Sequence, residues 1–366
     1  MANTFLTPDI IAREALMVLQ NNMVMSNLIY KNYAQEFQGA KKGDTITIRK
    51  PATFSVNEFT SEISVQTATE GSTSITLDKH LDVSFSVTAK DLTLEINDFS
   101  QQLLMPAMEA FAQDIDSRIA MLYKDIPYKF GTAGTTPSGV ASILGIRKKM
   151  NDNKVPFAGR NLVLDTAADA KLLELDTFVE ADKSGNTDGL MEARLGRKFG
   201  FDIYTDQNIK THTAGAGTVL IDLVAGYDVG ATAIHVDGVT TVLKVGDLLT
   251  IGGNDYVVTV AGALSTADQD ITIYPALKTA VANDDAVTLT ASHASNIAFH
   301  KNAFAMVSVP LELPMGTDKA AIVNYNGLAL RVVYGYNLTN KVDTVSIDML
   351  CGFKTLTPEL ACVLLG

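Results

Sequence analysis

The sequence predicts an α+β fold into which a small β-barrel domain is inserted, and three observations lead to this prediction. Helical and strand periodicities both occur, in separate stretches of the chain. Residues 217–293 show a pattern of short strands separated by Gly, Asp and Asn turns, and the stretches on either side do not show this pattern. The chain has 366 residues, more than the roughly 250 to 300 at which a single hydrophobic core stops growing.

Two patterns precede residue 90. Residues 9–29 carry apolar side chains at helical spacing, which predicts a helix with Asp9 as a candidate N-cap. The methionines of this helix are expected to face either the protein core or a partner, and the core is the simpler interpretation. From Asp44 the period becomes two, over residues 45–49, 54–56, 63–65, 74–77 and 81–87, which indicates half-buried antiparallel strands. The segment Arg49–Thr73 is polar and poor in large apolar residues, so we expect a long projecting hairpin without a core of its own.

A long helix is expected from Asn97 to Asp125. Its apolar residues follow one stripe, while Asp114 and Asp116 lie off that stripe on what we expect to be a solvated face. Pro106 is expected to kink or restart the helix. At about 1.5 Å per residue the helix would extend about 40 Å and act as a strut.

An α/β region follows the strut. We expect a helix from Ser138 through Met150, a strand at residues 161–164, and a helix capped by Asp165 or Thr166. Residues 180–189 should form an exposed loop, since they include no large apolar residue. Five or six short strands then form the barrel, and the strand texture of the main domain resumes at about residue 303.

Composition excludes several classes of protein. Hydrophobic residues make up 47% of the chain and charged residues 19%, so the chain is globular. The net charge of −12 argues against a protein whose main task is to grip nucleic acid, because that task needs a basic surface. The longest stretch without Asp, Glu, Lys or Arg has 17 residues and is rich in Gly and Thr, so no membrane span is expected. The N-terminus has no basic region before its apolar residues, which predicts a cytoplasmic chain without a secretory signal.

A search for chemistry finds no catalytic, cofactor or metal motif. The five histidines do not fall at ligand spacings, and Gly215-Ala-Gly217 lacks the third glycine of a nucleotide loop. Cys351 and Cys362 have apolar neighbours and are expected to be small buried core residues. The basic clusters at residues 41–42, 147–149 and 197–198 are short, which fits solvated side chains or rim contacts. We therefore expect no enzyme and no cofactor.

The order of these parts resembles the major capsid proteins of tailed bacteriophages, which share the Hong Kong 97 fold. Residues 43–51, GDTITIRKP, are similar to the N-arm running into the extended E-loop, and residues 97–125 to the spine helix. Residues 155–164 and 195–204 resemble the axial domain, and residues 296–303, 334–336 and 347–353 the returning strands of the peripheral domain. Residues 243–253 and 271–276 are similar to the insertion domain in the coat protein of short-tailed Salmonella phages, the closest resemblance within the family.

The resemblance implies six successive regions. They are an N-arm (1–43), the E-loop with flanking strands (44–90), the spine helix of the peripheral domain (91–137), the axial domain (138–216), the inserted β-barrel domain (217–293), and the axial return with the peripheral strands and C-terminus (294–366).

The resemblance also implies a function. Such a chain self-assembles as hexamers and pentamers into the icosahedral head that encloses a double-stranded DNA genome, which it contacts without sequence specificity. A scaffolding protein and a portal are the expected assembly partners, and the resemblance leaves room for a decoration protein. The chain would reside in the host cytoplasm before assembly and in the virion afterwards.

The hairpin at residues 49–73 should then lie across an adjacent subunit, because an interface supplies the burial that it lacks. The loop at residues 180–189 should face the capsomer axis. The residues expected to make contacts between subunits are Lys50, Glu58, Phe59, Glu62, Asp182, Lys183, Arg197 and Lys198.

Two other classes compete with a capsid subunit. A phage tail protein or other structural assembly protein would explain the strands, but it does not predict a strut helix between the hairpin and the α/β region. An enzyme with an unrecognised site should show a convergent group of titratable residues.

Overall fold

A computed structural model describes residues 8–31, 45–49, 56, 58, 65, 71–88, 103–185, 188–263, 267–314, 319–337 and 342–366. These residues form two compact units. The first unit gathers α1, β1 to β3, the first turns of α5, and β16 to β19. The second contains α2, the rest of α5, and the elements from η2 to β15 together with η3 and β20. No helix among the described residues has both the length and the apolar composition needed to cross a bilayer.

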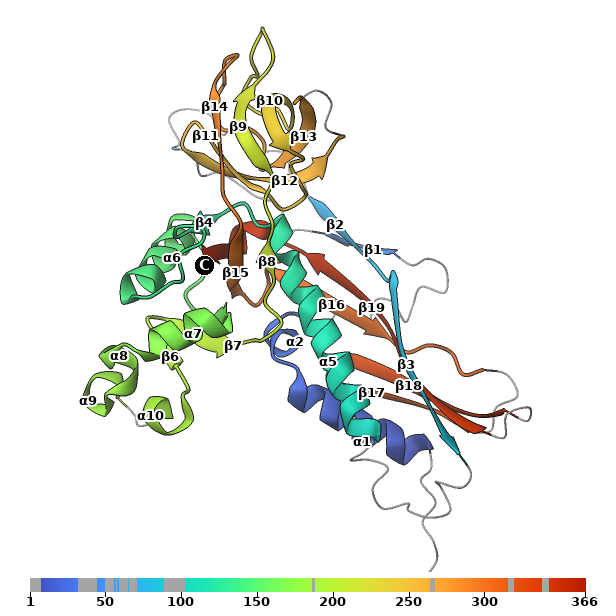
Figure 1. The fold of residues 1–366 in the computed structure, drawn as a ribbon. Coiled ribbons are helices and arrows are strands. Elements are labelled where there is room, and N and C mark those ends of the chain that lie inside the picture. Colours follow the sequence, from blue (N-terminus) through green and yellow to red (C-terminus); the bar gives the residue numbers. More distant parts are fainter. Residues whose placement is uncertain are drawn as a thin grey trace, which may run out of the picture. The chain divides into compact units, whose positions relative to one another are not determined.

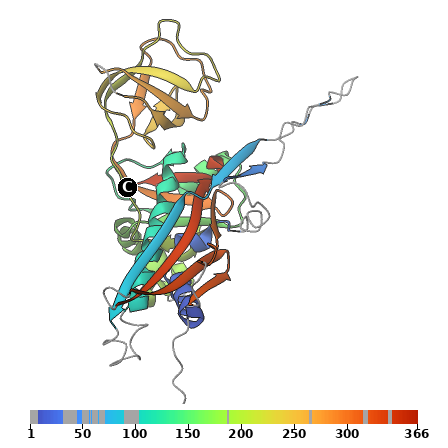
Figure 2. The same ribbon diagram turned by 90° about the vertical axis from the view of Figure 1, so that its right-hand side faces the viewer.

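The first unit is built on a five-stranded sheet in the order β16-β19-β18-β17, with β3 also paired to β19. Figure 2 shows β3 and β19 running side by side as two long strands, and their antiparallel register extends from Val342↔Thr88 to Cys351↔Lys79. Helix α1 packs on β17 and β18. The bounds are α1 Pro8–Asn22, β3 Lys79–Thr88, β16 Phe304–Val309, β17 Ala320–Tyr325, β18 Leu328–Asn337 and β19 Val342–Thr355.

The predicted hairpin is confirmed at its base. Strand β1 (Thr45–Arg49) pairs with β2 (Ser72–Thr76) in antiparallel register from Thr45↔Thr76 to Arg49↔Ser72. Most of the segment between these strands, including the expected strands at 54–56 and 63–65, lies outside the described residues, where only Val56, Glu58 and Val65 are described.

The second unit contains a seven-stranded mixed sheet in the order β4-β20-β15-β5-β7-β6, with β8 also paired to β15 (Figure 1). Its core joins apolar residues of β5, β7 and β20 to those of α6 and α7. The strand bounds are β4 Lys129–Phe130, β5 Arg160–Leu164, β6 Gly196–Lys198, β7 Phe201–Thr205, β8 Thr211–His212, β15 His293–His300 and β20 Ala361–Leu365. The helix bounds are α2 Met25–Leu28, α6 Val140–Asp152, α7 Thr166–Leu173, α8 Asp176–Val179, α9 Ala181–Ser184, α10 Asp188–Glu192 and η3 Pro358–Leu360.

A closed six-stranded barrel in the order β10-β13-β12-β11-β14-β9 lies between β8 and β15 in the chain. Closure leaves no free strand edge, and the inward side chains form a separate apolar cluster. The first strand, β9, was not among the expected segments, because its start is rich in glycine. A Cβ on Gly217 would lie 2.3 Å from the carbonyl oxygen of Gly238, so a strand crossing requires glycine here rather than a nucleotide loop. The bounds are β9 Ala216–Ile221, β10 Ala233–Thr241, β11 Leu248–Ile251, β12 Asn254–Ala261, β13 Gln269–Tyr274 and β14 Ala286–Leu289.

The strut helix is present from residue 105. Helix α5 (Met105–Ala120) continues as the 3-10 helix η2 (Met121–Asp125), while residues 89–102 lie outside the described part of the chain. Residues 103 and 104 are π-helical and run directly into α5, so Pro106 stands where the helix changes from π to α geometry, as expected of a proline that kinks or restarts a helix.

Three expectations about local structure are wrong in detail. The N-terminal helix is two helices, α1 and α2, with a break at residues 23–24. The helix after residue 138 is capped by Gly139 rather than Ser138. In the segment expected to be a loop, residues 181–184 form α9 and residues 188–189 begin α10. Gly189 is buried, and a Cβ there would lie 2.3 Å from the carbonyl oxygen of Phe178.

Candidate assembly surfaces

The hairpin base is fixed to the first unit by one buried side chain. Ile75 is the buried residue of β2, and it packs with Ala305, Val307 and Leu356. Gly352 of β19 permits this approach, because a Cβ there would lie 2.2 Å from the carbonyl oxygen of Thr76. The base is therefore held rigidly, as a projecting hairpin requires.

Four predicted contact residues fall in the hairpin itself. Glu58 is exposed, whereas Lys50, Phe59 and Glu62 lie outside the described residues. The role of all four in subunit contacts stays a prediction.

Two further predicted contact residues, Asp182 and Lys183, are exposed on α9. Lys183 Nζ lies 2.6 Å from Glu180 Oε2 and 3.4 Å from Asp176 Oδ2. The hydrogen bond to Glu180 raises the pKa of Lys183. Lys183 is thus paired within its own segment, and Asp182 remains the outward charge.

The last two predicted residues, Arg197 and Lys198, lie on β6, the strand at one end of the seven-stranded sheet. Arg197 is 68% exposed, with its Nε 3.6 Å from Asp202 Oδ1. Arg147 of α6 lies close by, since a Cβ on Gly200 would be 3.9 Å from its guanidinium carbon. Arg147, Arg194, Arg197 and Lys198 are called the basic edge below.

A buried polar network at the base of the barrel was not predicted from the sequence. Tyr123 Oη lies 2.8 Å from His212 Nδ1, and His212 Nε2 lies 2.6 Å from Asp247 Oδ1. Burial, followed by the charge of Asp247, raises the pKa of Tyr123 to about 12. The three residues come from η2, β8 and the turn before β11, so no local spacing could have revealed them.

The network is structural. Tyr123 is 4% exposed, His212 3% and Asp247 0%, so no substrate can reach these groups. Asp247 also accepts hydrogen bonds from the backbone N–H groups of Lys244 and Gly215. Both ring nitrogens of His212 and both carboxylate oxygens of Asp247 thus have hydrogen-bond partners.

Three more polar contacts join the barrel to the rest of the second unit. Lys149 Nζ of α6 donates to Asp255 Oδ2 at 2.6 Å. Lys129 Nζ of β4 donates to Thr290 Oγ1 at 2.5 Å. The hydroxyl of Tyr274 donates to Glu359. With the buried network, these contacts spread the attachment of the barrel over several elements.

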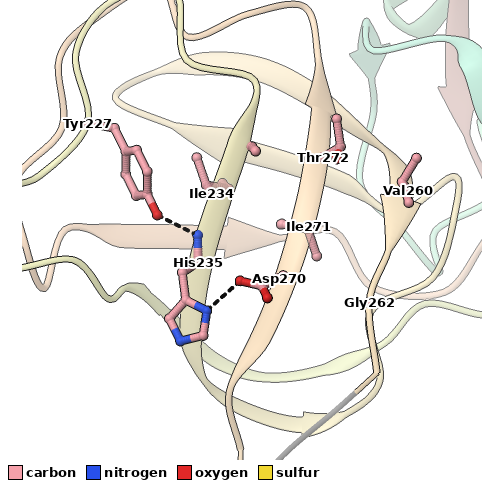
Figure 3. Close-up of a pocket in the computed structure, with 9 residues that line it drawn as sticks. Tyr227, Ile234, His235, Val260, Gly262, Asp270, Ile271 and Thr272 are labelled. Carbon is pink, nitrogen blue, oxygen red and sulfur yellow. Dashed lines mark hydrogen bonds and ion pairs between the residues drawn. The ribbon is translucent and has the colours of Figure 1, made fainter.

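A shallow groove of about 250 Å³ crosses the outer face of the barrel at strands β10 and β13 (Figure 3). His235 stands in it, with Nδ1 2.7 Å from Asp270 Oδ1 and Nε2 3.6 Å from Asp222 Oδ2. The hydrogen bond to Asp270, with the charges of Asp222 and Asp268, raises the pKa of His235. This groove, with Asp222, His235, Asp268 and Asp270, is called the acidic groove.

Metal and thiol chemistry find no support in the described part of the chain. Nowhere there do three His, Cys, Asp or Glu side chains come together in a group that could hold a metal ion. Cys351 and Cys362 are buried thiols that form no disulfide, as predicted, and burial strongly raises the pKa of Cys362.

No family model and no curated protein matches this sequence. Among solved structures, the chain is similar to one from Mycobacterium phage Che8, with a TM-score of 0.54 and 16% identity over 93% of this chain and 90% of that one. It is also similar to the capsid structure of the cyanophage P-SCSP1u, with a TM-score of 0.51 and 13% identity over 89% of this chain and 84% of that one. Over nearly all of its length, this chain therefore has the fold of these two phage structures.

Proposed function

We propose that this protein is the major capsid protein of a tailed phage, with a Hong Kong 97-like fold and an inserted barrel domain. The single observation that carries the proposal is the likeness to the cyanophage capsid structure over 89% of the chain. The chain acts as a structural protein rather than an enzyme, and it assembles from hexamers and pentamers into an icosahedral head around double-stranded DNA.

The anchored hairpin supports this proposal. Ile75 and Gly352 fix the base of the hairpin to a large sheet, while the segment between β1 and β2 carries few large apolar side chains of its own. Such a segment gains burial when it lies on a neighbouring subunit. Glu58 and the other hairpin residues named above are the proposed contacts.

The charge of the chain is consistent with a DNA container. A net charge of −12 keeps packaged DNA from adhering to the wall of the head. A scaffolding protein and a portal are the proposed partners during assembly, and a decoration protein is a further candidate on the finished shell.

The test is expression of the chain with and without a candidate scaffolding protein, followed by sedimentation and negative-stain electron microscopy of the soluble fraction. We expect closed shells, or hexamers and pentamers. A chain that stays monomeric at every concentration and with every scaffold would contradict the proposal and favour a tail component.

A further inference from the structure

The barrel carries most of the negative charge of the chain. Residues 216–292 contain nine aspartates and two lysines, with no glutamate or arginine, which gives this segment a net charge of −7 out of −12 for the whole chain. The other 289 residues share the remaining −5. Charge is therefore concentrated on about a fifth of the sequence.

Both lysines of the barrel make contacts at the place where the barrel joins the rest of the second unit. Lys244 Nζ donates to the carbonyl oxygen of Thr213, next to the point where the chain enters the barrel. Lys278 Nζ lies 5.6 Å from the centre of the Tyr128 ring, which belongs to the segment before β4. Neither lysine neutralises the outer face of the barrel.

The acidic groove lies on that outer face. Side chains of Asp222 and Asp270 are 47% and 85% exposed, and the ring of His235 lies between them. Among the described residues, no Lys or Arg nitrogen lies within 4 Å of these carboxylates or of Asp268. Val260, 60% exposed, lines the same groove and gives it an apolar floor.

The acidity extends beyond the groove. Asp284 N–H donates to the carbonyl oxygen of Ile221, and Ile221 N–H donates to that of Asp285, so the loop before β14 lies beside Asp222. Asp284 and Asp285 are both exposed. The surface thus combines a concave apolar strip with a rim of aspartates that the chain itself leaves without lysine or arginine partners.

The basic edge is the matching surface. Residues 194–200 contain Arg194, Arg197 and Lys198 and no acidic residue. Arg194 is exposed, and neither it nor Arg147 has a carboxylate oxygen within 4 Å among the described residues. β6 is the last strand in the order of its sheet, so no other described strand pairs with its outer edge.

We propose that the acidic groove of one copy binds the basic edge of a second copy of this chain. This inference rests on the proposed function, which brings many copies together. Copies that each carry a charge of −12 repel one another, so association requires a local match of opposite charges where they meet. The groove supplies three aspartates and the edge four cationic side chains for that match, whereas an isolated exposed ion pair would be too weak to do so.

The test uses charge reversal in the full-length chain. Asp270→Arg and Arg197→Asp are made singly and together, and self-association is measured by sedimentation equilibrium. Each single variant should weaken association by roughly tenfold, and the double variant should restore it, because the reversed pair attracts again. Raising salt from about 50 to about 300 mM should weaken the wild-type contact by shortening the screening length. Glu109→Lys, an exposed change of the same charge on α5, is the control and should leave association unchanged.

The outcomes separate this inference from the proposed function. Unchanged association in both single variants, or no recovery in the double variant, overturns the inference even if shells form. Recovery in the double variant without closed shells under any condition supports the inference and overturns the capsid proposal. A wild-type chain that never self-associates overturns both. Matching circular dichroism spectra and melting temperatures exclude misfolding of the exposed-site variants.

Discussion

At the scale of single residues, Asp116 shows how tertiary contacts change the role of a side chain. It was expected on a solvated helix face, yet it is 2% exposed. Its carboxylate accepts the backbone N–H of Val24 at 2.7 Å and that of Ser26 at 3.2 Å. It thereby fixes the break between α1 and α2 and satisfies donors at the start of α2, which no side chain of α2 itself caps.

Asp116→Ala should therefore be costly, because it leaves two backbone donors without their acceptor. We expect a loss of about 2 to 3 kcal/mol in the free energy of unfolding, measured by urea denaturation. Asp114→Ala, two residues earlier on α5, is the matched control. It removes only the exposed pair with Arg118, so about 0.5 kcal/mol or less is expected. Equal losses in the two variants would show that Asp116 is not a buried acceptor.

His293 predicts a dependence of stability on pH. Its Nδ1 donates to the carbonyl oxygen of Ala291, and its Nε2 is buried without a partner among the described residues. Burial lowers the pKa of His293, and the charges of His212 and Lys129 act in the same direction. The hydrogen bond to Ala291 and the charge of Asp247 oppose this shift without cancelling it. As the pH falls below 6.5, the ordinary pKa of histidine, His293 is protonated in the unfolded chain but not in the folded chain. The free energy of unfolding therefore decreases.

His293→Asn keeps an N–H donor near the position of Nδ1 and removes the titration. The free energy of unfolding between about pH 7.5 and about pH 5.5, one unit either side of the ordinary histidine pKa of 6.5, should then vary less than in the wild type. His235→Asn should act with the opposite sign. The raised pKa of His235 adds stability below pH 6.5 that is lost as pH rises, so its removal should steepen the loss at low pH. Identical pH profiles in all three proteins would contradict this assignment.

At the scale of elements, the anchorage of the hairpin depends on Ile75. The side chain is fully buried among residues of β16 and the end of β19. Ile75→Ala should lower the free energy of unfolding by about 2 to 4 kcal/mol in urea denaturation, since it leaves a cavity in this small cluster. The neighbouring Ser74 is exposed, and Ser74→Ala should cost under about 0.5 kcal/mol. A small effect of Ile75→Ala would show that the hairpin base is held by backbone pairing alone.

At the scale of the whole molecule, the barrel can be deleted from the chain, because the segments that enter and leave it lie side by side. His212 of β8 and His293 of β15 are paired residues, so the chain enters and leaves the barrel at neighbouring positions. A linker of about four residues in place of 214–291 should close this gap at little entropic cost. The shortened chain should keep the seven-stranded sheet in circular dichroism, with a melting temperature lower by roughly 5 to 10 °C, because several hydrogen bonds to the barrel are lost.

The double variant Asp255→Ala with Tyr274→Phe is the control for this excision. It removes the bonds to Lys149 and Glu359 but keeps the barrel. A partial decrease in melting temperature is expected from it. An excised chain that cannot fold would mean that the barrel is needed to form the sheet and is more than an attachment to it.

The sequence by itself determined the kinds of element and their order. The alternation at residues 45–49 predicted β1 to the residue, and the strand expected at 161–164 was off by one position. These successes have a local cause, since period-two alternation and turn residues are properties of neighbouring positions. The barrel strand β9 was missed because it starts with Ala216 and Gly217, which carry no period-two pattern of large side chains.

The tertiary structure alone decided which polar residues are buried and what they contact. Asp165 rather than Thr166 caps α7, because its Oδ1 accepts the N–H of Ala168. Asp116 meets the backbone near residue 24, and Tyr123, His212 and Asp247 meet across three separate elements. Each of these contacts joins positions far apart in the chain or depends on the exact backbone geometry. A local periodicity cannot encode such contacts, since they exist only after the sheets and the barrel have brought distant segments together.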